Sequence, residues 1–155
     1  MTIYLFALLI GVVSGLRTLT APAAVSWAAH LGWLPLEGTP LGFLGASLTP
    51  YAFSLLAIGE LIVDKLPKTP SRKAPAGFGS RIASGAFCGA AIGTAGGAPL
   101  VGLIAGGVGA VIGTLGGYEL RVRLVKAIGG WDLPVALLED ACAIGAAAWI
   151  VSSAA

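Results

Sequence analysis

The sequence predicts an all-α membrane protein, with residues 1–155 forming a single transmembrane domain of about five helices. Of its 155 residues, 57% are hydrophobic and only 10% are charged, whereas a soluble domain carries roughly 25% charged residues. Several apolar segments are also long enough to cross the ~30 Å hydrocarbon core of a bilayer as helices. Because so few charges cannot cover a water-facing surface, the composition excludes a soluble enzyme, a nucleic-acid-binding protein and a disordered chain. A lipid bilayer is the expected partner.

The first apolar segment, residues 2–33, is too long for one upright crossing. As a straight helix it would measure about 48 Å at about 1.5 Å per residue, well beyond the ~30 Å hydrocarbon core. Arg17 interrupts it between Gly15 and Pro22, residue types at which helices break. We therefore expect a broken first helix and count five spans. If residues 2–33 form a hairpin, the count is six.

Four further spans follow, separated by segments rich in glycine, proline or charge. The loop before the second span, residues 34–49, contains several glycines and prolines, and residues 67–78 are polar and proline-rich. A Gly-Ala-Pro turn separates the third span from the fourth. The predicted spans are residues 50–66, 79–96, 100–118 with an amphipathic extension to 128, and 134–152.

The basic residues predict the orientation of these spans. Five of them (Lys65, Lys68, Arg72, Lys73 and Arg81) lie between the second and third spans, and three (Arg121, Arg123 and Lys126) follow the fourth. The connections at 34–49 and 97–99 contain no lysine or arginine. Because cytoplasmic loops carry an excess of these residues, we expect residues 67–78 to be cytoplasmic. With five spans, the N-terminus is cytoplasmic as well.

Two segments echo each other in the sequence. Residues 15–33 and 113–131 align without gaps, and each ends in Gly-Trp with a proline shortly after. Equivalent positions in the two segments are three spans apart along the chain, in the first and the fourth span. Because three is an odd number, the two segments run in opposite directions through the membrane. The pattern predicts an inverted repeat of two spans, a central span and two spans, as in many small transporters and channels. The alternative is a chance match between segments rich in alanine, glycine and leucine.

Glycines recur every fourth residue along the third and fourth spans. This spacing places them on one face of a helix, where the missing Cβ atoms let two helices approach closely. We expect the third span to pack on the fourth in this way; the alternative is a homo-oligomer interface, and we expect the chain to form a homo-oligomer. The glycines concerned are Gly85, Gly89, Gly93, Gly102, Gly106, Gly109 and Gly113.

Ionisable residues inside the spans are the strongest indication of function, because each is energetically unfavourable in hydrocarbon. Glu60 lies ten residues into the second span, roughly 15 Å deep, and Arg17 lies at a similar depth, so we expect the two to form an ion pair. Asp64 follows one turn after Glu60 on the same helix face. Polar residues beside Arg17 are expected to line the same solute- or ion-binding site: Ser14, Thr18 and Thr20.

A second set of charged residues is predicted near the cytoplasmic ends of the spans: Arg81, Glu119, Arg121, Glu139 and Asp140. No metal or cofactor site is expected. The glycine-rich stretch lacks the Gly-Lys-Ser/Thr sequence of a phosphate loop. Neither Cys88 nor Cys142 belongs to a CxxC motif or has a histidine nearby in the sequence.

We interpret the site around Arg17 and Glu60 as the centre of a transporter or channel for a small solute or ion. One alternative is a structural membrane protein in which Arg17 and Glu60 only clamp helices together. Another is a membrane enzyme acting on lipid phosphates at the cytoplasmic interface, where the second set of charges lies. An enzyme is less favoured, because no complete motif of a membrane phosphotransferase is present.

Two stretches resemble a known family. They are SGLRTLTAPAAVSWAA (residues 14–29) and GELIVDKLPKTPSRKAPAGFGSRIASGAFCGAAIG (residues 59–93), which are similar to the domain-of-unknown-function family 4126 of small, mostly bacterial, multi-span membrane proteins. The resemblance covers most of the chain. It implies a helical protein of the bacterial inner membrane, with transport as the expected role. It assigns no substrate, reaction or catalytic residue.

Overall fold

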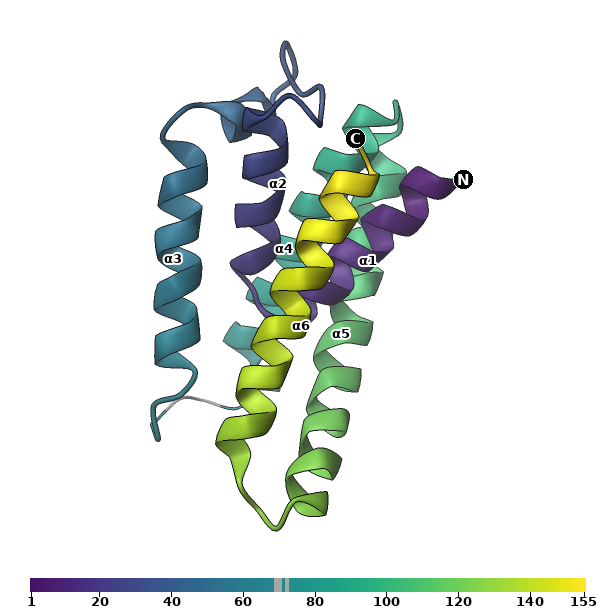
Figure 1. Cartoon of the computed structure of the whole chain (residues 1–155). Helices are drawn as coiled ribbons and strands as arrows, with labels where there is room; N and C mark the ends of the chain where they lie inside the picture. Colours follow the sequence, from purple (N-terminus) through teal and green to yellow (C-terminus); the bar gives the residue numbers. More distant parts are fainter. Residues whose placement is uncertain (69–70, 72) are drawn as a thin grey trace.

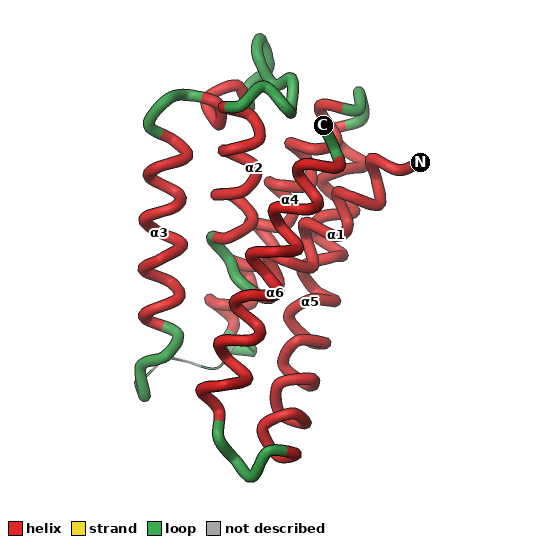
Figure 2. The backbone as a smooth tube through the Cα atoms, in the orientation of Figure 1, coloured by secondary structure: helices red, strands yellow, loops and turns green. Residues whose placement is uncertain are grey.

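The computed structural model describes residues 1–68, 71 and 73–155 as an all-helical protein. The described residues form six α-helices and one short 3₁₀ helix, with no strand among them (Figures 1 and 2). Arg72 of the predicted basic cluster, with residues 69 and 70 of the predicted cytoplasmic loop, lies outside the described residues. In chain order the helices are α1 (Thr2–Leu16), α2 (Thr20–His30), η1 (Gly42–Gly45), α3 (Thr49–Val63), α4 (Pro75–Ala95), α5 (Pro99–Ala127) and α6 (Asp132–Ser153).

Helix boundaries follow local sequence signals. Helices α3, α4 and α5 each carry a proline in the first turn, where its missing N–H and fixed φ are favourable. Gly97 turns the chain between α4 and α5 with a φ of 78°, a conformation that glycine adopts without steric strain. The predicted spans after residue 49 therefore coincide closely with α3 to α6.

Two helices, α5 and α6, are long and apolar enough to cross a membrane by themselves. Helices α1 and α3 are apolar but have only 15 residues each, or about 22 Å at about 1.5 Å per residue. Length and composition thus support membrane association through α5 and α6, but the five predicted spans are not confirmed.

Residues 2–33 reverse direction at their break. In Figure 1, α1 descends from the N-terminus to the middle of the molecule, and α2 rises back to the end where α1 began. Ile3 accordingly lies against Gly96 in the α4–α5 turn, and Trp33 lines the same cavity as Ser152 near the C-terminus. This is the hairpin alternative. The hairpin places the N-terminus at the end opposite the basic segments. The five-span count instead predicts that the N-terminus lies at the same end as those segments.

The predicted inverted repeat is wrong. Helices α1 and α5 run in the same direction, because Gly11 lies beside Gly106 and Gly15 lies beside Ala110 and Thr114. The reversal after Arg17 also adds a change of chain direction that the five-span count omits. In addition, α5 continues unbroken through the residues aligned with the Arg17 break.

Helices α1, α4 and α5 form the most tightly packed part of the protein. A Cβ atom on Gly89 would overlap the Gly102 carbonyl, and one on Gly106 would overlap the Gly85 carbonyl. Gly93 lies against Gly102, whereas Gly109 and Gly113 lie against α1 at Leu8 and Val12. Helices of the same chain therefore cover the glycine faces. The contact of Gly109 and Gly113 with α1 was not predicted from the sequence.

Polar and apolar side chains are distributed as in a lipid-solvated protein. Large apolar side chains such as Leu55, Ile104 and Leu138 are more than half exposed, whereas Arg17 is completely buried and Asp140 nearly so. Water-soluble domains rarely expose contiguous apolar surface of this kind. Charged groups inside a membrane protein, in contrast, face its interior.

Candidate functional site

The candidate site is centred on the break between α1 and α2, residues 17–19. At a break, the last carbonyls of one helix and the first amides of the next lose their helical partners. The chain supplies new partners for the α1 carbonyls. Arg81 Nη1 donates hydrogen bonds to the carbonyls of Gly15 and Leu16 at 2.9 and 2.8 Å, and Thr114 donates to Gly15 at 3.2 Å. A cation thus lies at the negative end of the α1 dipole.

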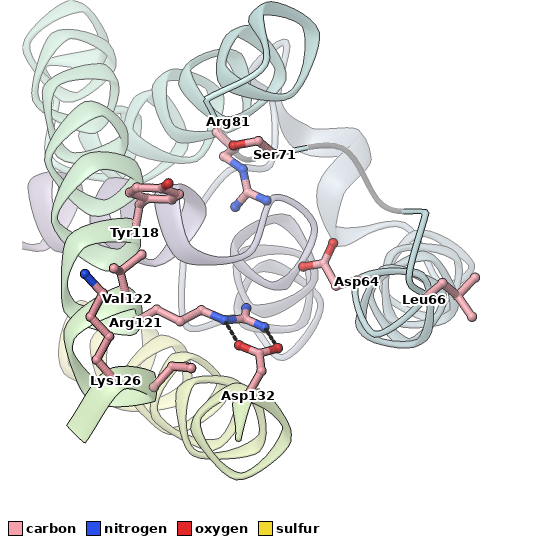
Figure 3. Close-up of a pocket in the computed structure, with 10 residues that line it drawn as sticks. Asp64, Leu66, Ser71, Arg81, Tyr118, Arg121, Val122, Lys126 and Asp132 are labelled. Carbon is pink, nitrogen blue, oxygen red and sulfur yellow. Dashed lines mark hydrogen bonds and ion pairs between the residues drawn. The ribbon is translucent and has the colours of Figure 1, made fainter. Parts of the chain in front are cut away.

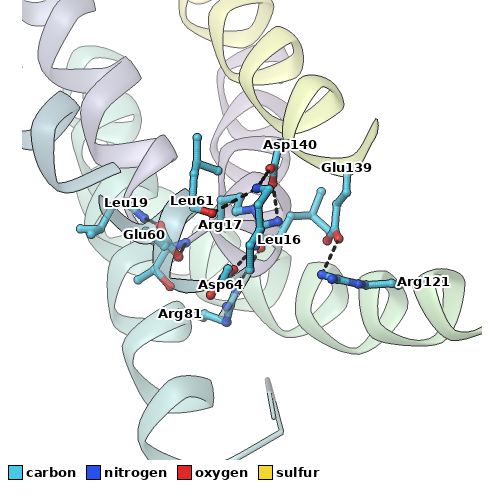
Figure 4. A network of polar contacts seen from close by, with 12 residues as sticks. Leu16, Arg17, Leu19, Glu60, Leu61, Asp64, Arg81, Arg121, Glu139 and Asp140 are labelled. Carbon is cyan, nitrogen blue, oxygen red and sulfur yellow. Dashed lines mark hydrogen bonds and ion pairs between the residues drawn. The ribbon is translucent and has the colours of Figure 1, made fainter. Parts of the chain in front are cut away.

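Glu60 of α3 serves the opposite side of the break. Its two carboxylate oxygens accept hydrogen bonds from the backbone N–H groups of Thr18 and Leu19, both at 2.7 Å (Figure 4). Ser84 of α4 donates to the Thr18 carbonyl at 2.6 Å. An anion therefore lies at the positive N-terminal end of α2, where the helix dipole stabilises it.

Arg17 is the centre of an ion cluster formed by Arg17, Asp64, Lys65 and Asp140. Arg17 Nε donates to Asp140 Oδ1 at 2.6 Å, and Arg17 Nη1 forms a close ion pair with Asp64 (Figure 4). The second oxygen of Asp140 accepts a hydrogen bond from Lys65 Nζ at 2.5 Å. Two cations and two carboxylates balance, so the cluster is formally neutral around the completely buried Arg17.

The expected Arg17–Glu60 ion pair is therefore wrong in its partner. Glu60 does lie at the level of the break, as its depth predicts, but it binds backbone amides, and Arg17 pairs with Asp64 and Asp140 instead. The reason is the reversal of the chain, which points the N-terminus of α2 at α3. Asp140 was assigned to the second set of charges, and Lys65 was not predicted as a site residue. The position of Lys65 directly after Asp64 in the sequence was the available signal for it.

The remaining predicted site residues are distributed around the break. Ser14 donates to the Arg81 carbonyl at 3.1 Å and is fully buried. Thr18 takes part only through its backbone N–H and carbonyl groups among the contacts described above. Thr20 is buried at the start of α2 and lines an apolar cavity between α2, α3 and α6.

The second set of charges does not form one cluster. Arg121 binds Asp132 through two hydrogen bonds of 2.9 and 2.6 Å and contacts Glu139 at 3.4 Å. Glu119 is exposed and lies 3.7 Å from Lys73. Arg81 belongs to the break and Asp140 to the ion cluster. The predicted second set is therefore divided between the site and the end of the α5–α6 pair where Arg121 meets Asp132.

A polar cavity of about 440 Å³ opens at the basic end of the molecule. Asp64 of the ion cluster and Arg81 of the break belong to its lining (Figure 3). Its other charged lining residues are Arg121, Lys126 and Asp132. The ion cluster is thus adjacent to the cavity, and the Arg121–Asp132 pair lies at its wall. Among the described residues, no three metal-ligating side chains gather into a group.

No family model matches this chain, and no curated protein or solved structure is significantly similar to it. The resemblance to family 4126 stays a prediction. The chemistry of the site is therefore inferred from its geometry: a polar cavity that meets a charge-balanced cluster, centred on the buried Arg17, at a helix break.

Proposed function

We propose that the chain is a multi-span protein of the bacterial inner membrane that transports a small solute or ion through the polar cavity, with the ion cluster as its gate. The basic end, with residues 67–78, then faces the cytoplasm. The observation that carries the proposal is the contact of the cavity with an ion cluster centred on the buried Arg17 at a broken helix. Broken helices and intramembrane charges commonly mark transport sites.

Helix α3 is the candidate moving element. Of its residues only Pro50 is fully buried, and its helix packing is with α2 and η1. That packing includes Trp27 of α2, which bonds to Ser54 and stacks edge-on against Tyr51. Towards its C-terminal end, α3 is tied by polar contacts: Glu60 to the break, Asp64 to Arg17 and Lys65 to Asp140.

These polar contacts separate two cavities. Asp64 lines the polar cavity, and Leu61, one turn earlier on α3, lines the apolar cavity of about 650 Å³ between α2, α3 and α6. Exchange of the Asp64 and Lys65 ion pairs would release the end of α3 and join the two spaces. This supports a gate that opens by breaking ion pairs, with α3 swinging against a fixed bundle.

The test is flux into proteoliposomes across a panel of inorganic ions and small anionic metabolites. We expect wild-type protein to carry at least one class. Arg17→Gln should abolish that flux in correctly inserted protein, because α3 released from the cluster no longer returns to the closed position that a transport cycle needs. Arg123→Gln is the matched control, because Arg123 is exposed and is not part of the cluster or the cavity lining. Full flux in Arg17→Gln would contradict the gate.

A reversible lock tests the role of α3 separately. Cysteines introduced as Leu61→Cys and Ile144→Cys face the apolar cavity from α3 and α6, and a cleavable bifunctional thiol reagent would tie them in a background without Cys88 and Cys142. Flux should stop on cross-linking and return on cleavage. Absence of any flux by inserted wild-type protein, together with turnover of a lipid phosphate, would favour the enzyme alternative.

A further inference from the structure

We propose that the apolar cavity between α2, α3 and α6 is a binding site for one acyl chain of a zwitterionic phospholipid, from the leaflet at the end opposite the basic segments. The proposal rests on membrane insertion, which is part of the proposed function, and it does not require transport. It concerns the space on the other side of the ion cluster from the polar cavity, in the closed arrangement of the structure.

The cavity is hollow because its walls are made of small residues. Alanines line it from three helices, including Ala24 of α2, Ala57 of α3 and Ala148 of α6. Its volume is about 650 Å³, within the ~300–1,000 Å³ range of ligand pockets. Helix α3 cannot close onto α6 without losing its packing on α2 or its polar contacts at the break. The space therefore needs an occupant.

The lining selects an aliphatic occupant. Only three of the lining residues carry hydroxyl groups, and two of these are already hydrogen-bonded within the protein: Ser54 accepts from Trp27, and Ser152 donates to the Trp149 carbonyl, both at 2.9 Å. The rest of the lining is formed by alanine, aliphatic and tryptophan side chains. A polar solute would lose its hydration in such a space without gaining hydrogen bonds.

The length of the cavity matches one leaflet. Its lining extends along α2 from Thr20 to Leu31. The 11 residues of α2 rise about 16 Å at about 1.5 Å per residue. Half of a ~30 Å hydrocarbon core is about 15 Å, which is the depth that one acyl chain occupies.

The outer end of the cavity indicates where the headgroup lies. Three of the four tryptophans line this cavity, and Trp33 and Trp149 lie with Ser152 towards its outer end. Indole rings prefer the headgroup level of a bilayer. Residues 31–48 at this end contain Glu37 and no lysine or arginine. With no lysine or arginine in this segment to bind an anionic headgroup, its single carboxylate favours a zwitterionic lipid over an anionic one.

Tryptophan fluorescence gives a direct test in phosphatidylcholine vesicles whose acyl chains are brominated at mid-chain, because bromine quenches indole on contact. One variant keeps Trp27 alone, with the other three tryptophans replaced by phenylalanine; a second keeps Trp149 alone. Trp27 is half-buried between α2 and α3, whereas Trp149 is 59% exposed on α6. We expect both to be quenched.

A cavity-filling substitution makes the test specific. Ala148→Phe projects into the cavity, whereas Ala146→Phe on the same helix does not line it; both positions are exposed, so neither substitution disturbs the core. We expect Ala148→Phe to reduce quenching of Trp27 at least twofold. Quenching of Trp149 should fall much less, because this side chain is 59% exposed and also faces lipid outside the cavity. Ala146→Phe should change neither. In mixed vesicles, brominated phosphatidylcholine should quench Trp27 more than brominated phosphatidylglycerol.

Each other outcome overturns a defined part of the inference. Quenching of Trp149 without Trp27, or equal quenching of Trp27 in Ala148→Phe, would overturn the acyl-chain site and leave membrane insertion intact. Stronger quenching by the anionic lipid would overturn the headgroup assignment. If neither tryptophan is quenched, the chain is not in the bilayer, and the proposed function fails as well.

Discussion

Helices α1, α4 and α5 meet backbone to backbone, and Gly11, Gly85 and Gly106 contribute one contact surface from each helix. Helices α2, α3 and α6 instead surround a cavity of about 650 Å³, and α3 is joined to the others near the break by Glu60, Asp64 and Lys65. We refer to these as the glycine-packed half and the open half. Both occur in one chain of 155 residues.

This difference supports the proposed division of the chain into a rigid scaffold and a movable part. Contacts between helix backbones are numerous and close, and they have a single good arrangement, because a shift of either helix would produce overlaps. Ion pairs and carboxylate–amide hydrogen bonds can exchange partners with only small side-chain movements. We therefore expect motion in the open half and rigidity in the glycine-packed half.

The largest expected effect is from breaking the glycine-packed half. Gly106→Leu places a side chain against the Gly85 carbonyl and the Gly89 backbone, where no flexible side chain can move aside. The destabilisation should exceed the ~1–3 kcal/mol typical of overpacking, and folded protein should be lost on size exclusion in detergent. Gly116→Leu is the control, because nothing lies within 4 Å of a Cβ at that position. Normal behaviour of Gly106→Leu would refute the close packing.

The next effect is from leaving the ion cluster unbalanced. Arg17→Gln leaves Asp64 and Asp140 with Lys65 as the only cation of the cluster, and loss of one partner of a buried ion pair costs about 3–5 kcal/mol. Thermal unfolding in detergent should show a marked fall in Tm. Adding Asp64→Asn restores a neutral cluster with the Lys65–Asp140 pair intact and should recover most of the stability. Adding Glu60→Gln to Arg17→Gln should recover none of the stability. Recovery in that double variant would indicate that Arg17 pairs with Glu60.

A smaller effect is expected from Glu60 alone. Glu60→Gln keeps one acceptor for the amides of Thr18 and Leu19 but loses the other and the negative charge at the α2 N-terminus. Loss of a comparable helix cap costs about 1 kcal/mol, so Tm should fall by less than in Arg17→Gln. Glu37→Gln, in an exposed loop position, should not change Tm. An effect of Glu60→Gln as large as that of Arg17→Gln would place Glu60 inside the cluster.

No loss of stability is expected from cysteines that report topology. In a background without Cys88 and Cys142, Ser71→Cys should react with an impermeant thiol reagent only from the cytoplasmic side. Thr2→Cys should react only from the outside, because α1 begins at the end opposite the basic segments. Labelling of both positions from one side would contradict the hairpin of α1 and α2 in the membrane.

Glycine packing was predictable from the sequence because it depends on spacing alone. A repeat of four residues defines one helix face whatever the tertiary arrangement, and Gly89 and Gly102 meet accordingly. The break at Arg17 was predictable for a similar reason, since the length of residues 2–33 exceeds the bilayer thickness.

The reversal of the chain at the break could not be predicted. Hydropathy gives the depth of a residue but not the direction of the next helix, so the partners of Arg17 and Glu60 were assigned by depth alone. The predicted depth of Glu60 agrees with its position beside the break. Depth gave no indication of the contact between Arg17 and Asp140, which lie 123 positions apart in the sequence. Such pairings depend on packing between helices, which a single sequence does not specify.

The measurement that tests the comparison most directly is the distance between spin labels by pulsed electron resonance in liposomes. One pair joins α3 to α5 at Ile62 and Leu124, and the other joins α4 to α5 at Ala83 and Leu124; all three positions are exposed. For the α4–α5 pair we predict one narrow distance that Arg17→Gln leaves unchanged. For the α3–α5 pair we predict two distances, and Arg17→Gln should increase the population at the longer one. A single narrow distance for both pairs, unchanged by Arg17→Gln, would contradict a movable α3 held by the ion cluster.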